Sequence, residues 1–226
     1  MALATYKDLC IDAADPEVLG RFWAAALHLR YEALADGDAV LRGDRPEQTV
    51  WINKVPEPQT VKHRLHIDIR AESVADVEAL GATVVDADSF GWVVMKDPEG
   101  GELCVFETKP DKGPGFMEIN IDTTEDHRGI AAWWGELLGV EPGLQDQHGG
   151  QYSYLHAPPH CPWEDLVFVP VPEPKTAKNR LHLDVTTSDL QAVVDHGATV
   201  LREQDDQIGW TVLADPQGNE FCAFVA

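Results

Sequence analysis

The amino-acid sequence predicts an α+β protein of two tandem domains, residues 1–112 and 113–226, each built from two βαβββ modules. The main evidence is a repeat: VPEPQTVKHRLHID at 55–68 returns as VPEPKTAKNRLHLD at 171–184, with ten of fourteen positions identical. A Gly-Ala-Thr-Val step and an Asp-Pro-x-Gly turn follow each copy, with a cysteine seven residues after the aspartate of the turn. Matches at one fixed spacing indicate a duplicated structural unit.

The composition narrows the class of function. The chain carries 17 basic and 39 acidic side chains, a net charge of −22, so it lacks the basic face that nucleic-acid binding requires. No apolar run is long enough to cross a membrane, and the first residues lack the pattern of a signal peptide. No Cys-x-x-Cys pair is present, so we expect reduced thiols and a cytoplasmic protein. The acidic balance favours a cationic ligand only weakly.

Periodicity gives the order of elements in the first half. Alternation over 7–13 predicts a strand, and Asp15 followed by Pro16 predicts the start of a helix. Trp23 belongs to the apolar stripe of that helix, so we expect it in the core. Further strands are predicted at 31–34, 39–42, 49–55, 65–70, 83–86, 92–96 and 102–107, with a second helix between the Ser73 cap and Gly81.

The second half repeats this order after a linker at 108–115, with a strand at 118–122 and a helix that carries Trp133 and Trp134. It differs by a longer loop at 141–162. The histidines and cysteine of this loop are His148, His156, His160 and Cys161. Consecutive prolines prevent a helical histidine pair and no second cysteine pair completes a zinc site, so we interpret the segment as a solvated loop.

Several of these motifs together resemble a known superfamily. They are the helix entry Ala-Asp-Pro-Glu-Val-Leu-Gly-Arg-Phe-Trp, the strand Arg-Leu-His-Ile-Asp, the helix exit Leu-Gly-Ala-Thr and the ending Asp-Pro-x-Gly-x-x-x-Cys. The chain resembles the vicinal-oxygen-chelate superfamily of glyoxalases, bleomycin-resistance proteins and extradiol dioxygenases, and is most similar to tandem glyoxalase-like domains. The resemblance implies that the two modules of each domain form one curved mixed sheet around a cleft. In catalytic members the cleft holds a divalent metal.

The resemblance also implies positions for a site. The histidine ligand of the family falls on His66 and His182, and alternation turns His66 and Asp68 away from the apolar face of their strand. The remaining ligand positions fall on Asp8 and Glu118 in the first strands, on Cys104 and Cys222 in the last strands, and near Asn53 and Val169. Two candidate metal groups follow: Asp8, His66 and Cys104, and, less favoured, Glu118, His182 and Cys222.

The side chains at these positions are compatible both with the absence of a cofactor and with a bound divalent metal. Cysteine stands where the family has glutamate, and Val169 offers no donor, so we expect no cofactor. The alternative is a divalent ion of zinc, iron, nickel or manganese, because carboxylate, imidazole and thiolate are competent ligands. In a purely structural reading, each histidine ring instead hydrogen-bonds Asp8 or Glu118 across the sheet.

Two classes of function follow from the resemblance. The first is a small-molecule binding protein of the bleomycin-resistance type, which sequesters a cationic or aromatic ligand in the cleft of each domain. Its candidate ligand-binding residues are Asp8, Asp12, Asp68, Trp92, Glu118, Asp122, Asp184 and Trp210. The second is a lyase, isomerase or dioxygenase, either metal-assisted or with His66 or His182 as a catalytic general base. For either function we expect a monomer with internal pseudo-symmetry or a weak homodimer, without nucleic-acid or membrane partners.

Overall fold

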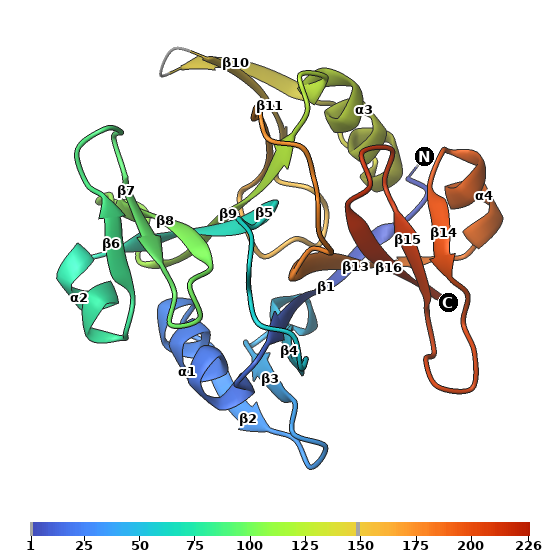
Figure 1. The fold of residues 1–226 in the computed structure, drawn as a ribbon. Coiled ribbons are helices and arrows are strands. Elements are labelled where there is room, and N and C mark those ends of the chain that lie inside the picture. Colours follow the sequence, from blue (N-terminus) through green and yellow to red (C-terminus); the bar gives the residue numbers. More distant parts are fainter. Residues whose placement is uncertain (1, 148–149) are drawn as a thin grey trace.

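Two eight-stranded mixed sheets form the framework of the computed structural model, which describes residues 2–147 and 150–226 (Figure 1). Sheet A has the order β14-β15-β16-β13-β1-β4-β3-β2, and sheet B has the order β10-β11-β12-β9-β5-β8-β7-β6. If each strand of sheet A is replaced by the equivalent strand two modules away, the strand order of sheet B results, read in the opposite direction. The two sheets are therefore related by an approximate two-fold axis, and the predicted α+β class and four βαβββ modules are confirmed.

The strands of sheet A are β1 Thr5–Ala13, β2 Arg30–Ala33, β3 Ala39–Arg42, β4 Val50–Lys54, β13 Leu181–Thr187, β14 Thr199–Arg202, β15 Thr211–Ala214 and β16 Glu220–Val225. The strands of sheet B are β5 Leu65–Ala71, β6 Thr83–Asp86, β7 Val93–Lys96, β8 Glu102–Glu107, β9 Gly115–Thr123, β10 Gly143–Gln147, β11 Gly150–His156 and β12 Asp165–Pro170. The helices are α1 Pro16–Ala26, α2 Val74–Ala79, α3 His127–Leu138 and α4 Leu190–Asp195, and a short 3-10 turn spans Pro46–Gln48.

The helices start where the sequence predicts. Asp15 caps α1 by accepting hydrogen bonds from the N–H groups of the first turn, and Ser73 caps α2 in the same way. Trp23 is 2% exposed and lies in the core, as expected from its place in the apolar stripe. One continuous apolar core joins both sheets. None of the helices in the described ranges combines the length and apolarity needed to span a membrane.

The pairing of the modules differs from the expectation. We expected the two modules of each half to share a sheet, but β1 pairs with β13 from the other half, and β5 pairs with β9. Sheet A therefore joins the first and fourth modules, and sheet B joins the second and third. The chain path explains this difference. The short segment 108–114 leads β8 into β9 of the same sheet, on the other side of β5, whereas the connector after β4 crosses to the other sheet.

The segment 141–162 is also different from the expectation. Most of it forms the antiparallel hairpin of β10 and β11, which extends sheet B, and only its last residues form a loop. His148 lies outside the described residues. His156 Nδ1 lies 2.7 Å from Asp165 Oδ1, and Cys161 packs against the core. The hairpin is the counterpart of β2 and β3 in sheet A, and its alternation was obscured by glycine and proline around it.

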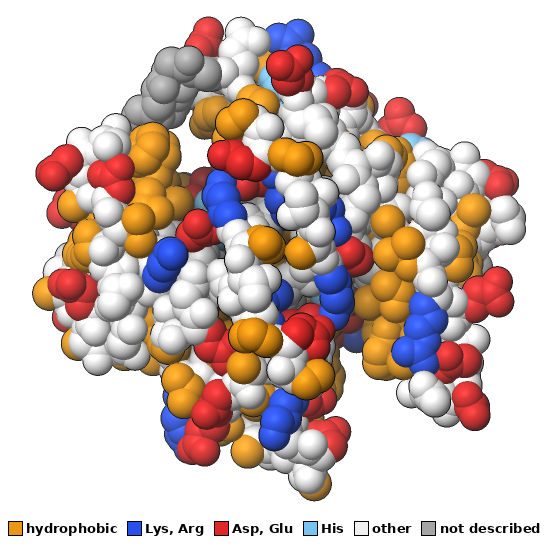
Figure 2. Space-filling model, viewed as in Figure 1, with side chains coloured by type: hydrophobic (Ala, Val, Ile, Leu, Met, Phe, Trp, Pro, Cys, Tyr) orange, Lys and Arg blue, Asp and Glu red, His pale blue; other side chains and the backbone are white. Residues whose placement is uncertain are grey.

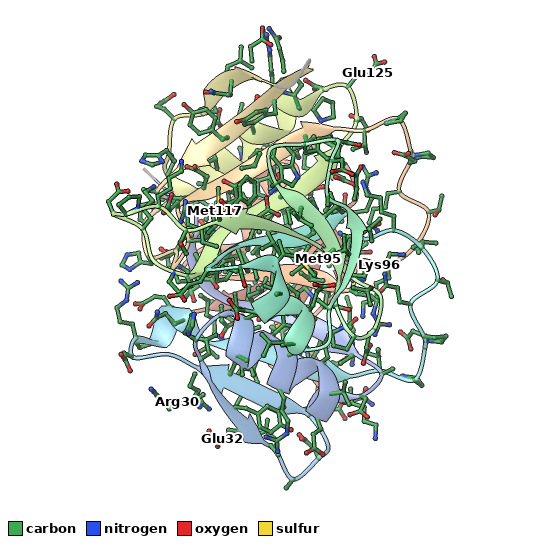
Figure 3. The ribbon with its side chains drawn as sticks, turned by 90° about the vertical axis from the view of Figure 1, so that its left-hand side faces the viewer. Arg30, Glu32, Met95, Lys96, Met117 and Glu125 are labelled. Carbon is green, nitrogen blue, oxygen red and sulfur yellow. The ribbon has the colours of Figure 1, made fainter. Side chains whose placement is uncertain are left out.

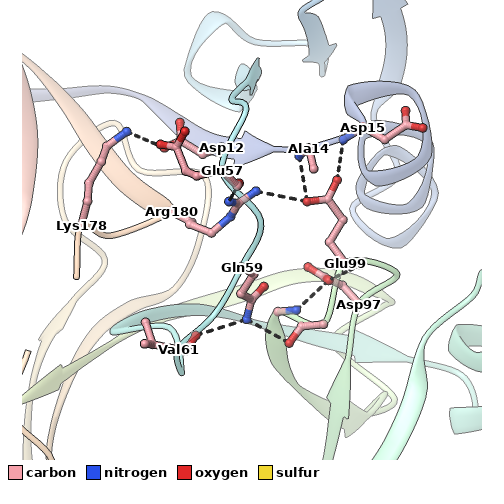
Figure 4. Close-up of polar contacts among 12 residues, drawn as sticks. Asp12, Ala14, Asp15, Glu57, Gln59, Val61, Asp97, Glu99, Lys178 and Arg180 are labelled. Carbon is pink, nitrogen blue, oxygen red and sulfur yellow. Dashed lines mark hydrogen bonds and ion pairs between the residues drawn. The ribbon is translucent and has the colours of Figure 1, made fainter. Parts of the chain in front are cut away.

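The two connectors that carry the repeated motif are joined by reciprocal hydrogen bonds, and Figure 4 shows those of Arg180. Arg180 donates to the carbonyl of Glu57 at 2.8 Å, and Arg64 donates to the carbonyl of Glu173 at 2.7 Å. Arg180 also bonds Glu99, whose carboxylate accepts the N–H groups that precede α1. The Val-Pro-Glu-Pro repeat is thus a reciprocal joint between the halves.

Each sheet curves around its own hollow. Figure 2 shows one opening between the side of β6–β8 and that of β10–β11, and another between the side of β2–β4 and that of β14–β16. A side view places Met95 and Lys96 on β7, Met117 on β9, and Arg30 and Glu32 on β2 at the far end of sheet A (Figure 3). The inner faces of the two curved sheets are called the sheet A face and the sheet B face below.

Candidate functional site

A buried polar group lies at the middle of the sheet B face. It is formed by His66 and Asp68 of β5, Cys104 of β8, and Asn120 of β9. The apolar neighbours in β5, Ile67 and Ile69, point to the core, so alternation places the polar side chains on the inner face, as the sequence predicts. Asp68 pairs with Cys104 on one side and with Glu118 on the other, which brings three strands together.

The donor atoms of this group converge. His66 Nε2 lies 3.4 Å from Asp68 Oδ1 and 3.7 Å from Cys104 Sγ, and the ligand atoms of the three residues all lie within 4.8 Å of one another. Asn120 donates a hydrogen bond of 2.9 Å to Asp68 Oδ2. Asp68 Oδ1 and His66 Nδ1 are buried without a hydrogen-bond partner among the described residues. Such unpartnered buried atoms are costly and often mark a site for a ligand or an ion.

Burial controls the protonation of the group. It lowers the pKa of His66 to about 4, which keeps the imidazole neutral at pH 7. Burial, followed by repulsion from Asp165, raises the pKa of Glu118 to about 7. The pKa of Asp68 is raised well above its usual range by burial and by Glu118. The opposed carboxyls Asp68 and Glu118 therefore hold a proton between them near neutral pH, because two buried like charges cannot both ionise cheaply.

An aromatic stack borders this polar group. The rings of Phe90 and Trp92 are 5.0 Å apart, and those of Trp92 and Phe106 are 5.3 Å apart, both nearly parallel. Phe106 lies two residues after Cys104 in β8. Trp92 lies two residues before Val94, which pairs with Cys104. Alternation therefore puts the stack on the same inner face as Cys104. Phe90 is 47% exposed, so the stack reaches from the polar group to solvent.

The sheet A face carries a corresponding group. His182, Asp184 and Cys222 replace His66, Asp68 and Cys104, while Asp8 and Cys10 of β1 replace Glu118 and Asn120. The ligand atoms of Cys10, His182 and Asp184 lie within 4.8 Å of one another. Cys10 donates to Asp184 at 3.4 Å, and the indole N–H of Trp51 donates to Asp8 at 3.1 Å. Burial raises the pKa values of Asp184 and of Cys10.

The structure corrects both candidate metal groups. Asp8 does not join His66 and Cys104, because β1 lies in sheet A, opposite Asp184. Glu118 correspondingly lies opposite Asp68 in sheet B and not near His182. The first-strand residues of the two groups are therefore exchanged between the halves. The expected groups were wrong because we expected the two modules of each half to share a sheet. The two histidines also make no hydrogen bond to Asp8 or Glu118; each lies 3.4 Å from the aspartate of its own strand.

The other predicted ligand-binding residues lie at the margins of the two faces. Asp12 and Asp122 are each bonded by a lysine of the opposite half, Lys178 at 2.6 Å and Lys62 at 2.7 Å. Trp210 borders the sheet A face, where its ring lies 5.5 Å from that of Phe224. Asn53 and Val169 pair with Asp12 and Asp122, so both lie further along the strands than the polar groups.

Sequence reasoning missed four residues that contact these groups: Cys10, Trp51, Phe106 and Asn120. Cys10 lies between Asp8 and Asp12 in β1, and Asn120 lies between Glu118 and Asp122 in β9, so the period of two already places both on the inner face. Phe106 likewise follows Cys104 by two. Trp51 had no such signal, because its contact with Asp8 depends on the parallel pairing of β1 with β4.

A cavity of about 600 Å³ lies apart from both faces, between the two connectors. Its cationic side chains already have partners. Lys178 bonds Asp12, and Arg180 bonds Glu99 (Figure 4). The pseudo-symmetric Lys62 bonds Asp122, and Arg64 bonds backbone carbonyl groups. These contacts hold the halves together, so we place the candidate functional site on the sheet faces.

The donor set of the sheet B group fits a divalent metal. Imidazole, carboxylate and thiolate are zinc ligands, and three protein ligands with one open position are typical of catalytic zinc sites. The unpartnered Asp68 Oδ1 and the neutral His66 provide lone pairs at the point of convergence. Burial raises the pKa of the Cys104 thiol far above its usual range, so binding of a metal would have to displace its proton.

Comparisons with known proteins agree with this fold. The model of the glyoxalase-like domain matches residues 8–106 and again 118–224. Glyoxalase I from Zea mays superposes with a TM-score of 0.66 at 13% identity, over 98% of this chain and 92% of that one. A candidate dioxygenase from Bacillus subtilis superposes with a TM-score of 0.64 at 14% identity, over 98% and 85% of the two chains. No curated protein sequence matches the chain. Because the family model covers most of the sequence in two copies, the chain belongs to the glyoxalase-like domain family.

Proposed function

We propose that this protein binds and sequesters a small organic cation on the sheet B face, without chemical conversion. The observation that carries the proposal is the position of the acid pair, buried Asp68 and half-buried Glu118, beside the stack of Trp92 and Phe106. A carboxylate attracts an ammonium group, and an aromatic face adds a cation–π contribution of about 0.5–2 kcal/mol. A cation can interact favourably with both the carboxyl groups and the aromatic rings at this position.

The acidic surface supports the same class of ligand. With a net charge of −22, the chain on balance attracts cations and repels anions. The aromatic stack runs from the exposed Phe90 inward to Phe106, so a ligand with a flat apolar part can follow it toward the carboxyls. Occupation of the site by a cation would also remove the cost of two opposed buried acids.

Benzylamine is a suitable first probe, because it joins an ammonium group to an aromatic ring. We expect it to quench tryptophan fluorescence with a Kd tighter than about 1 mM, which corresponds to about −4 kcal/mol. Benzyl alcohol has the same ring without the charge and should bind at least ten times more weakly. Recovery of unchanged benzylamine by mass spectrometry is expected after long incubation.

Two variants test whether benzylamine binds on the sheet B face. Replacement of Glu118 by glutamine should weaken benzylamine binding at pH 8 at least tenfold, and Trp92→Phe should remove most of the quenching. Glu78→Gln is the matched control, because Glu78 is an exposed glutamate on α2, in the other module of sheet B. Equal affinity for benzylamine and benzyl alcohol, or conversion of the amine, would contradict the proposal.

A second candidate is a metal-assisted enzyme of the lyase, isomerase or dioxygenase kind. It is favoured by the convergence of His66, Asp68 and Cys104 within 4.8 Å. A bound divalent ion would act as a Lewis acid that polarises a substrate oxygen. In this function Glu118, whose pKa is about 7, is placed to hold or release a proton beside the three ligands.

Metal binding can be tested without knowledge of a substrate. Protein purified without an affinity tag should contain close to one equivalent of zinc, iron, nickel or manganese if this candidate is right. Cobalt substitution should then produce a thiolate charge-transfer absorption that disappears in Cys104→Ser and persists in Cys161→Ser, since Cys161 lies outside the group. A metal content below about a tenth of an equivalent would exclude the metal-assisted function, because a working site must be occupied.

A further inference from the structure

We propose that Lys7 is an internal occupant of the sheet A face, where its ammonium group takes the place of an external cation, so that only the sheet B face is open to a ligand. This inference rests on the proposed function of the sheet B face. It predicts which of two nearly equivalent sites binds and names the residue that makes the difference.

A β-bulge brings Lys7 to the inner face. In the pairing of β1 with β13, Tyr6 lies opposite Val185 and Asp8 lies opposite Asp184, so Lys7 is the extra residue. Adjacent strand residues normally point to opposite faces, and a bulge changes the direction of the side chain at the inserted position. Lys7 can therefore contact the side chain of Asp8, the next residue along the chain.

The ammonium group of Lys7 makes the contacts expected of a bound cation. Lys7 Nζ lies 2.5 Å from Asp8 Oδ2 and 4.2 Å from the centre of the Phe224 ring. Phe224 follows Cys222 by two residues in β16 and stacks loosely with Trp210. The lysine thus joins the carboxylate and the aromatic rings of the sheet A face. Its side chain is 32% exposed, so its outer part covers this group from solvent.

The sheet B face has the same framework with a different residue at the bulge. In the pairing of β9 with β5, Met117 is the extra residue, directly before Glu118 (Figure 3). Glu118 corresponds to Asp8, and Phe106 corresponds to Phe224. Methionine has no charge, so the acid and aromatic elements of this face lack the internal ammonium group that sheet A has.

Arg70, a buried cation whose charge also acts on Glu118, is held by a different carboxylate. Arg70 donates two hydrogen bonds, of 2.8 and 2.9 Å, to the carboxylate of Glu164, and Lys112 bonds the same carboxylate at 2.6 Å. A bidentate pair fixes the guanidinium group firmly in place. Lys62, on the other side of the group, bonds Asp122. An external cation can therefore reach the position beside Glu118 that Lys7 occupies beside Asp8.

The inference is tested with two single variants, each of which puts the bulge residue of one sheet into the other, by calorimetric titration with benzylamine. The wild-type protein should bind one equivalent, Lys7→Met should bind two, and Met117→Lys should bind at least tenfold more weakly than wild type. In Lys7→Met the new site should quench Trp210 fluorescence, so Trp210→Phe should remove the added signal and leave that of Trp92. Circular dichroism should confirm that each variant is folded.

The outcomes separate this inference from the proposed function. If wild type binds no benzylamine and Lys7→Met binds one equivalent, the role of Lys7 stands and the proposed sheet B function fails. If a folded Lys7→Met has the same stoichiometry as wild type, the role of Lys7 is wrong. If Lys7→Met does not fold, Met117→Lys decides: loss of binding supports the inference, and unchanged binding overturns it.

Discussion

Replacement of Glu118 by glutamine is expected to change how the stability of the protein depends on pH. Burial raises the pKa of Glu118 from 4.5 to about 7, so the folded protein keeps a proton that the unfolded chain has already released. The free energy of unfolding therefore falls as pH rises from about 4.5 to about 7, and then levels off. The shift corresponds to about 3 kcal/mol. Glutamine, which cannot ionise, should remove this loss.

The measurement is urea-induced unfolding of both proteins between pH 5 and pH 8. The difference between the two stability curves isolates Glu118. It cancels His63 and His66, whose lowered pKa values act in the opposite direction as pH falls below about 6.5. Relative to wild type, Glu118→Gln should gain about 2.5 kcal/mol over this range, because part of the shift lies below pH 5. Parallel curves would show that Glu118 ionises normally in the folded protein, whereas Glu78→Gln should give parallel curves.

Removal of the Trp134 side chain is expected to cause the largest loss of stability. Trp134 is 2% exposed in the core between α3 and sheet A, where it contacts the rings of Trp133 and Phe221. Its indole N–H donates to the buried Asp215 at 3.1 Å. Truncation of a buried tryptophan to alanine leaves a large cavity, so Trp134→Ala should lower the free energy of unfolding by about 3–5 kcal/mol.

A second variant separates the two parts of this effect. Trp134→Phe keeps most of the apolar contact but loses the hydrogen bond to Asp215, and we expect a loss of about 1–3 kcal/mol. Val18→Ala on α1, where the side chain is 48% exposed, should change stability by less than about 0.5 kcal/mol. Urea-induced unfolding measures all three. A loss in Trp134→Ala no larger than that in Val18→Ala would contradict the core position of Trp134.

Under the proposed function, one copy of the duplicated unit keeps an open binding site and the other is closed by its own lysine. Both copies retain the histidine, the aspartate and the cysteine of the polar group at equivalent positions. The difference lies at the bulge, where one copy has Lys7 and the other has Met117. Lys7 pairs with Asp8 Oδ2 from within the chain, and its long side chain also brings the charge to the ring of Phe224.

The sequence by itself determined the modules and the local direction of their side chains. The repeat at 55–68 and 171–184, the caps at Asp15 and Ser73, and the alternation through His66 and Asp68 are all local patterns, and the structure agrees with each of them. Such patterns depend on steric and hydrogen-bonding preferences of residues that are close in the chain.

Only the tertiary structure decided which modules share a sheet, and therefore which residues share a site. A strand pattern shows which face is buried but carries no record of the strand that pairs with its edge. β1 could be assigned to either half by pattern alone, and its pairing with β13 moved Asp8 from His66 to His182. The contact of Lys7 with Asp8 depends in addition on the bulge between β1 and β13, which exists only once these strands have paired.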